Sequence, residues 1–141
     1  MPTTTTTHIN RDGDARALLD FYAEATGGQV VALTYRDAQW PLDEEHLDRV
    51  MWGEVRTGGG FHVMAFDVRP EQAYDAGSIP FFVSLRNDTE EECRVLWEGL
   101  AAGGTVVQDL GPAPWSPLYG MVSDRFGVTW VLDVAVPYAG N

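Results

Sequence analysis

The stretch from Ile79 to Val134, IPFFVSLRNDTEEECRVLWEGLAAGGTVVQDLGPAPWSPLYGMVSDRFGVTWVLDV, contains one complete βαβββ unit. Its apolar start, Ile79 to Leu85, predicts a strand. Thr89 and Glu92 then match the capping-box pattern that begins a helix, and Gly103-Gly104 marks the end of that helix. Three further strands are expected at 105–107, 118–123 and 128–134.

Two details of this unit bear on function. Apolar residues at helical spacing predict the buried stripe of its helix, and these are Cys93, Leu96, Trp97 and Leu100. The segment from Gly111 to Pro117 holds three prolines around Trp115 and predicts a stiff loop. An exposed tryptophan on such a loop would serve as a lid or as a dimer contact.

The first half of the chain carries a weaker copy of the same pattern. A strand is expected at 3–9, a helix between the turn at 10–14 and Gly27-Gly28, and strands at 29–35, 50–56 and 61–68. A shift of 76 residues places Phe21 on Trp97 and Gly27-Gly28 on Gly103-Gly104, and a shift of 66 places 65–68 on 131–134. The common order of these matches indicates an internal repeat.

The repeat predicts an α+β fold built from two βαβββ modules. Each module would form a curved antiparallel sheet with one helix on its outer face, which leaves a concave inner face. We expect a single domain over residues 1–141, with a first module at 1–68 and a second at 79–137.

Composition restricts the possible partners. The formal net charge of −12 argues against nucleic acid, whose phosphates require a basic surface, and favours cationic partners. No apolar run reaches the roughly 18 residues of a membrane span. Residues 1–8 have neither the basic start nor the apolar middle of a signal peptide, and the single cysteine, Cys93, cannot form an intramolecular disulfide. We therefore expect a cytoplasmic protein without nucleic-acid or membrane partners.

Strand parity predicts which side chains line the concave faces. On the last strand, Trp130, Leu132 and Val134 are the bulkier apolar set and should pack under the helix. The alternate set then faces the cavity, and the shift of 66 extends this choice to the first module. The residues expected to face the cavity are Thr129, Val131, Asp133, Val63, Ala65 and Asp67.

The segment Tyr119-Gly120-Met121-Val122, followed by Asp124 to Trp130, resembles the "YG.v.D.fG..W" ending of the vicinal oxygen chelate superfamily, also called glyoxalase/bleomycin-resistance/dioxygenase. More narrowly, the chain is similar to the PhnB-like, or 3-demethylubiquinone methyltransferase-like, branch, which is echoed at 19–22, 50–56 and 91–104. The resemblance implies paired βαβββ modules, usually in a homodimer. Members of the superfamily include metal-dependent isomerases, dioxygenases, thiol transferases and metal-free drug-binding proteins.

The resemblance also implies where a metal would be bound, because such members take one His, Gln or Glu from each of four strands. Those places fall on Thr7 or His8, near Ala65, on Phe81, and on Val131 or Leu132. Apolar residues cannot coordinate a divalent cation. A site for Ni, Zn, Fe or Mn would therefore depend on His8, Asp67 and Asp133, whereas His62 would face away if Ala65 faces the cavity.

Three functions remain open from the sequence. The first is metal-free binding of a small molecule, in particular a cationic or aromatic one. Its pocket would be lined by Trp52, Val63, Ala65, Asp67, Phe81, Trp115, Tyr119, Thr129, Val131 and Asp133. The second is a metal-dependent lyase, isomerase or dioxygenase. The third is a homodimeric interaction protein with a vestigial pocket.

Overall fold

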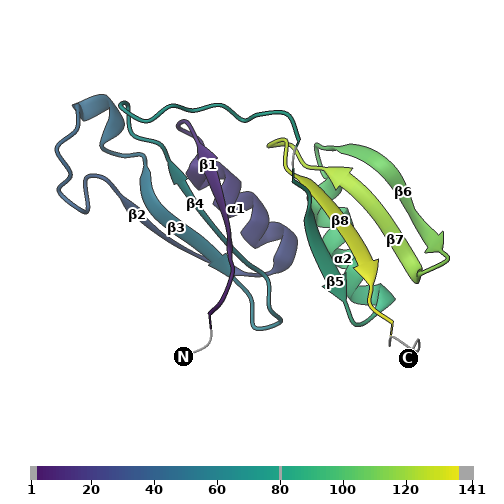
Figure 1. The fold of residues 1–141 in the computed structure, drawn as a ribbon. Helices are drawn as coiled ribbons and strands as arrows, with labels where there is room; N and C mark the ends of the chain where they lie inside the picture. The colour runs from purple at the N-terminus through teal and green to yellow at the C-terminus, as the bar shows by residue number, and fades with distance from the viewer. Residues whose placement is uncertain (1–2, 80, 137–141) are drawn as a thin grey trace. The chain divides into compact units, whose positions relative to one another are not determined.

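The computed structural model of the chain describes residues 3–79 and 81–136. The chain divides into two compact units, Met1–Gly77 and Ser78–Asn141, and each unit contains one four-stranded sheet and one main helix (Figure 1). The α+β fold with one βαβββ module per unit is therefore confirmed. The predicted second module ends at residue 137, which lies outside the described residues, as does residue 80 inside it.

The first unit contains β1 (Thr7–Arg11), α1 (Ala15–Thr26), β2 (Gln29–Thr34), the short 3-10 helix η1 (Glu44–His46), β3 (Val50–Arg56) and β4 (His62–Asp67). The second unit contains β5 (Val83–Asn87), α2 (Glu90–Ala101), β6 (Thr105–Ala113), β7 (Ser116–Ser123) and β8 (Thr129–Val134). None of the helices formed by the described residues has the length and apolar character needed to span a membrane.

Both sheets are mixed, which corrects the expectation of antiparallel sheets. The strand orders are β1-β4-β3-β2 and β5-β8-β7-β6, with β1 parallel to β4 and β5 parallel to β8. The reason lies in the connections. The helix that connects the first two strands of each unit leaves these strands parallel to each other. The two following connections each reverse the chain, so the third strand is antiparallel to the second and the fourth is antiparallel to the third. The first and fourth strands of each unit must therefore run parallel.

The helices begin and end largely where the sequence predicts. Gly27 ends α1 in the left-handed conformation with φ 76°, and its N–H donates to the carbonyl of Ala23. The Thr89 hydroxyl accepts the N–H of Glu92 at 3.1 Å at the start of α2. At the start of α1, by contrast, Asp14 makes no cap hydrogen bond and is paired with Arg11 at 2.7 Å.

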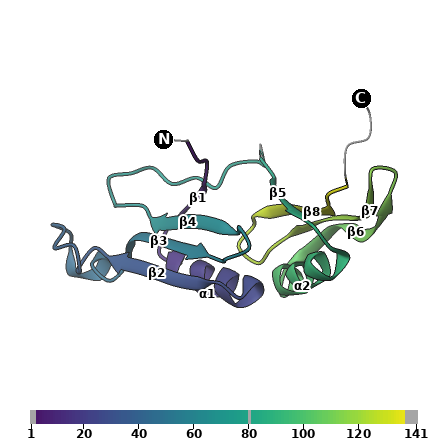
Figure 2. The same ribbon diagram turned by 90° about the horizontal axis from the view of Figure 1, so that it is seen from below.

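Each helix lies along one face of its own sheet, as Figure 2 shows from below. A glycine on the third strand of each module allows the close approach. A Cβ added to Gly53 of β3 would collide with Leu19 of α1, and a Cβ added to Gly120 of β7 would lie 2.9 Å from the indole of Trp97 in α2. These two glycines are structurally equivalent positions of the repeat.

The loop predicted at 111–117 is shorter in the structure, because most of its residues belong to strands. β6 runs to Ala113 and β7 starts at Ser116, so the two strands form one long hairpin with Pro114 and Trp115 at its tip. Pro112 is tolerated because β6 is an edge strand with one neighbour, and proline is compatible with such strands. The Ser116 hydroxyl is buried within hydrogen-bond distance of the carbonyls of Leu118 and Val134, at 2.8 and 2.9 Å, and donates its one proton to either of them.

Candidate functional site

The side of each sheet that carries no helix, which we call the helix-free face, is the candidate functional surface. In the second unit, Gly120 faces α2 and is the cross-strand partner of Leu132, so Leu132 faces α2 too. Trp130 and Leu132 are fully buried, whereas Val131 and Asp133 are half-buried on the helix-free face. The predicted parity of the last strand is confirmed.

In the first unit the predicted parity is wrong. Gly53 faces α1 and is the cross-strand partner of Ala65, so Ala65 lies under the helix together with Val63 and Asp67. All three are at most 2% exposed. The error comes from the shift of 66 residues, because Gly53 and Gly120 are equivalent and lie 67 apart. A slip of one residue moves every side chain of a strand to the other face.

Asp67 has a structural role at the start of α1. Its carboxylate accepts the backbone N–H groups of Gly13 at 2.7 Å, Ala15 at 3.0 Å and Val50 at 2.9 Å. The hydroxyl of Tyr35 donates to the Asp67 carbonyl at 2.6 Å. These bonds hold the β1–α1 turn and the start of β3 against the end of β4. The carboxylate is therefore directed away from the helix-free face.

The helix-free face of the first unit carries a hydrogen-bonded chain of polar side chains, Thr6, His62 and Glu54, that the sequence did not predict there. His62 Nε2 lies 2.9 Å from the Glu54 carboxylate, and His62 Nδ1 lies 3.1 Å from the Thr6 hydroxyl. The hydrogen bond with His62 is the main cause that lowers the pKa of Glu54 below its usual value. A neutral His62 that donates from Nε2 accepts the Thr6 hydroxyl at Nδ1, so the chain satisfies its own polar groups.

His8 lies on the same face with apolar neighbours. It is in register with Met64 of β4, and its ring packs edge-on against Phe66 with centroids 5.0 Å apart. Partial burial lowers the pKa of His8, which favours the neutral imidazole. The side chains around His8 on this face thus form an aromatic and thioether surface.

The residues present do not fit the divalent metal that the resemblance implies. Of the three predicted ligands, Asp67 faces α1 and its carboxylate accepts three backbone N–H groups, while His8 is in register with a thioether that hard cations disfavour, which leaves only Asp133. Among the described residues, one other group brings metal-binding atoms within 4.8 Å of one another. This group is Asp43, Glu45 and His46, in the acidic segment that includes η1 and outside both sheets.

On the helix-free face of the second unit, four predicted residues lie together. Trp115 packs edge-on against Tyr119, with ring centroids 5.1 Å apart and planes at 87°. Tyr119 is the cross-strand partner of Asp133, and Met121 is the partner of Val131. Trp115 is 56% exposed. The arrangement presents two perpendicular aromatic rings beside a carboxylate.

The remaining predicted residues are spread over different surroundings. Trp52 is half-buried on the helix-free face of the first unit, where Leu33 is its partner. Phe81 is 82% exposed and precedes β5, which begins only at Val83, so the predicted strand from Ile79 starts too early. Thr129 has the predicted parity but is only 7% exposed, which leaves little of it for a ligand.

Five side chains of the helix-free faces were not predicted from the sequence. Four of them, Glu54, Met64, Phe66 and Arg86, were not considered, and His62 was predicted to lie on the opposite face. A signal for the correct register was present in the chain. Trp52-Gly53-Glu54-Val55 aligns with Tyr119-Gly120-Met121-Val122 at a shift of 67, and both segments place an aromatic residue before the glycine that faces the helix. That alignment puts Met64 and Phe66 on the helix-free face.

The residues that carry the family resemblance have structural roles. Asp124 accepts the N–H groups of Phe126 at 2.8 Å and Val128 at 3.1 Å, and its second oxygen accepts the indole N–H of Trp130 at 2.9 Å. Asp124 thereby closes the β7–β8 turn and orients the largest buried side chain of the second unit. The motif predicts the fold and leaves the substrate undefined.

Comparisons with known proteins agree with this geometry. Residues 6–132 match the family model of the Glyoxalase/Bleomycin resistance protein/Dioxygenase superfamily. The chain is 30% identical to protein PA1353 from Pseudomonas aeruginosa, covering 95% of this chain and 98% of that one, with a TM-score of 0.82. It is 23% identical to a PhnB protein from Bacillus cereus, covering 94% and 100%, with a TM-score of 0.70. No curated protein matches the chain. The chain belongs to the glyoxalase/bleomycin resistance protein/dioxygenase superfamily.

Proposed function

We propose that the protein binds a small cationic aromatic molecule, without a metal, on the helix-free face of its second unit. The observation that carries the proposal is the grouping of Trp115, Tyr119 and Asp133 on one face of the β7–β8 pair. Trp115 offers its exposed indole to a flat ligand, and cations are attracted to the face of an aromatic ring. The Asp133 carboxylate supplies the opposite charge.

Electrostatics supports a cation over an anion. The chain carries a formal net charge of −12, which raises the local concentration of cations. Asp133 is paired with Arg86 at 3.3 Å, and the Arg86 side chain is 63% exposed while that of Asp133 is 14% exposed. An exposed arginine exchanges its partner at small cost, because surface ion pairs contribute about 0–1 kcal/mol. A bound cation can therefore replace Arg86 at Asp133.

Titration with N-methylquinolinium, a flat aromatic cation, tests the proposal through quenching of tryptophan fluorescence. Free N-acetyltryptophanamide measures the collisional contribution. We expect saturable quenching, and about tenfold weaker binding in Trp115→Leu because a cation–π contact contributes about 0.5–2 kcal/mol. Trp40→Leu is the matched control, since Trp40 is also a partly exposed tryptophan but belongs to the first unit. Purely collisional quenching would refute the proposal.

We further propose that the chain forms a homodimer. Proteins of this fold are often dimeric and bind small molecules. Support comes from exposed apolar side chains on the edge strands, namely Val31 and Leu33 of β2 and Val107 of β6, which are 39–55% exposed. Sedimentation equilibrium should give twice the chain mass of 15.5 kDa. A species of the single-chain mass at every concentration would contradict the dimer.

We also propose a cytoplasmic location, which the single, buried Cys93 supports. Fractionation of cells that produce the untagged protein tests this location. The protein should appear in the cytoplasmic fraction, and recovery from the medium or the membrane fraction would contradict it.

A further inference from the structure

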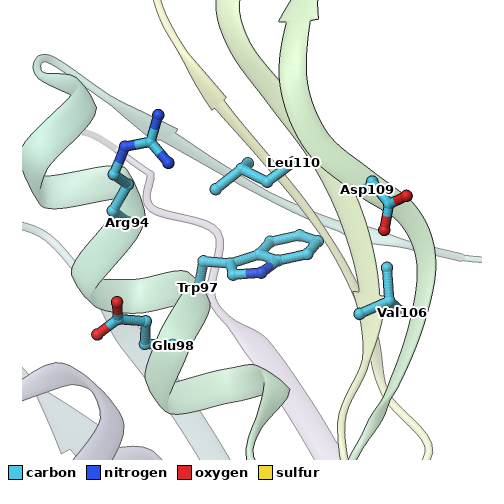
Figure 3. Close-up of a pocket in the computed structure, with 6 residues that line it drawn as sticks. All are labelled: Arg94, Trp97, Glu98, Val106, Asp109 and Leu110. Atoms are coloured by element: carbon cyan, nitrogen blue, oxygen red, sulfur yellow. The ribbon is translucent and has the colours of Figure 1, made fainter.

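A cavity of about 300 Å³ lies on the opposite side of the second sheet, between α2 and the edge strand β6 (Figure 3). Its lining residues are Arg94, Trp97, Glu98, Val106, Asp109 and Leu110. All six belong to the second unit, so the cavity is complete within that unit. Its volume is at the small end of the range of ligand sites, about 300–1,000 Å³.

The indole of Trp97 forms the apolar centre of this cavity. It lies against the bare backbone of Gly120, since a Cβ there would approach the indole Cζ3 to 2.9 Å and the indole Cη2 to 3.0 Å. Figure 3 shows the indole extending from α2 toward β6, with Leu110 on one side and Val106 at the far end. Trp97 remains only half-buried, because β6 leaves the cavity open to solvent.

The charged groups around the indole favour a cation. Glu98 of α2 and Asp109 of β6 are exposed, and neither has a cationic partner within 4.0 Å among residues 3–79 and 81–136. Arg94 lies 3.9 Å from Glu90, one helical turn earlier, and Figure 3 shows its guanidinium on the α2 side of the cavity, at the opposite end from Asp109. Figure 3 shows the Asp109 carboxylate beyond the far end of the indole, whereas the Glu98 carboxylate is directed away from it, so an ammonium ion over the outer part of the ring would meet Asp109.

We propose that this cavity is a second binding site and that it takes a small organic ammonium ion. The ammonium group would lie over the outer part of the indole of Trp97, beside the Asp109 carboxylate, and the carbon atoms of the ligand would contact Val106 and Leu110. Aromatic rings bordered by acidic side chains are a recurrent device for quaternary ammonium ions. The site is independent of the helix-free face, because it uses other residues on the other side of the sheet.

Titration of the full-length protein with choline chloride, followed by ¹H–¹⁵N NMR, tests the proposal. Sodium chloride at equal ionic strength is the reference, and ¹⁵N-labelled Trp97→Phe and Trp115→Leu proteins assign the indole resonances. We expect a saturable shift of the Trp97 indole N–H and of the Asp109 and Leu110 amides. The variant Asp109→Asn should bind about threefold more weakly, since one exposed charge contributes modestly.

Two matched variants distinguish binding in this cavity from a general charge effect and from binding on the helix-free face. Glu24→Gln removes one exposed negative charge from α1 and should leave choline binding unchanged. Trp115→Leu alters the helix-free face and should also leave it unchanged, so this site and the proposed function can fail separately. The proposal is overturned if the Trp97 resonance responds equally to sodium chloride. It is also overturned if Asp109→Asn binds as the wild type does, or if choline shifts only the Trp115 and Tyr119 resonances.

Discussion

At the scale of single residues, the side chains that determine the fold are buried polar groups with several partners. Asp67 and Asp124 each accept three hydrogen bonds, and each closes a turn next to the end of a strand. The sequence predicts that Asp67 and Asp133 both face the cavity. Asp67 is instead 1% exposed under α1, whereas Asp133 pairs with Arg86 on the helix-free face of its own sheet.

Replacement of Asp67 by Asn should lower the free energy of unfolding by about 2–3 kcal/mol, because an amide group would place N–H donors against the N–H groups of Gly13, Ala15 or Val50. Urea denaturation followed by circular dichroism measures the change. Asp20→Asn is the control, since Asp20 is an exposed partner of Arg16 and should cost less than about 1 kcal/mol. An equal, small effect of both variants would show that Asp67 is not a structural carboxylate.

The thiol of Cys93 should be unreactive in the folded protein. Burial, the largest cause, raises the pKa of Cys93 to about 11, with Asp133 adding to the shift. Because the pKa is raised, the thiol is protonated at pH 7–9, and only the thiolate attacks disulfide reagents. Reaction with Ellman's reagent at pH 8 should therefore be slow in buffer and fast in urea. Rapid stoichiometric reaction of the native protein would contradict this burial.

At the scale of elements, the sequence correctly predicted the order of strands and helices, but it predicted the wrong buried face for β4 in the first unit. The limits of β3 were predicted to the residue, and both helices were found from their caps and apolar spacing. The parity of β4 was lost because 65–68 and 131–134 look alike at a shift of 66. Similarity between two four-residue segments does not determine which face of a strand is buried. The close approach of Leu19 to Gly53 does, because it shows which side of β3 faces α1.

Gly120 should be the more sensitive of two glycines in the β6–β7 hairpin. A Cβ at Gly120 would lie 2.9 Å from Leu110 Cα and from the Trp97 indole, so Gly120→Ala should displace the indole and cost about 1–3 kcal/mol. Gly111→Ala is the matched control on the neighbouring strand, since its Cβ would meet no atom within 4 Å. Urea denaturation of both variants tests the packing. Similar midpoints would contradict the close approach of α2 to β7.

At the scale of the whole molecule, the chain presents aromatic rings and carboxylates on several surfaces of a strongly acidic protein. The composition pointed to cationic ligands, and the parity of β8 pointed to the helix-free face of the second unit. The shift of 67 indicates the face on which Glu54 and His62 lie, but the hydrogen bonds that join them to Thr6 depend on side-chain conformations that the sequence does not determine. The cavity beside Trp97 depends on the packing of a half-buried indole, which the sequence does not determine either.

The most direct test of the central claim is a ¹H–¹⁵N NMR titration of the assigned protein with N-methylquinolinium. The account predicts saturable shifts that cluster on the helix-free face of the second unit, at the Trp115 indole N–H and the amides of Tyr119, Val131 and Asp133, and that weaken in Asp133→Asn. Tyr119, Val131 and Asp133 are neighbours on β7 and β8, so a bound ring must affect them together. Shifts that are absent, do not saturate, or spare these residues would contradict the proposed function.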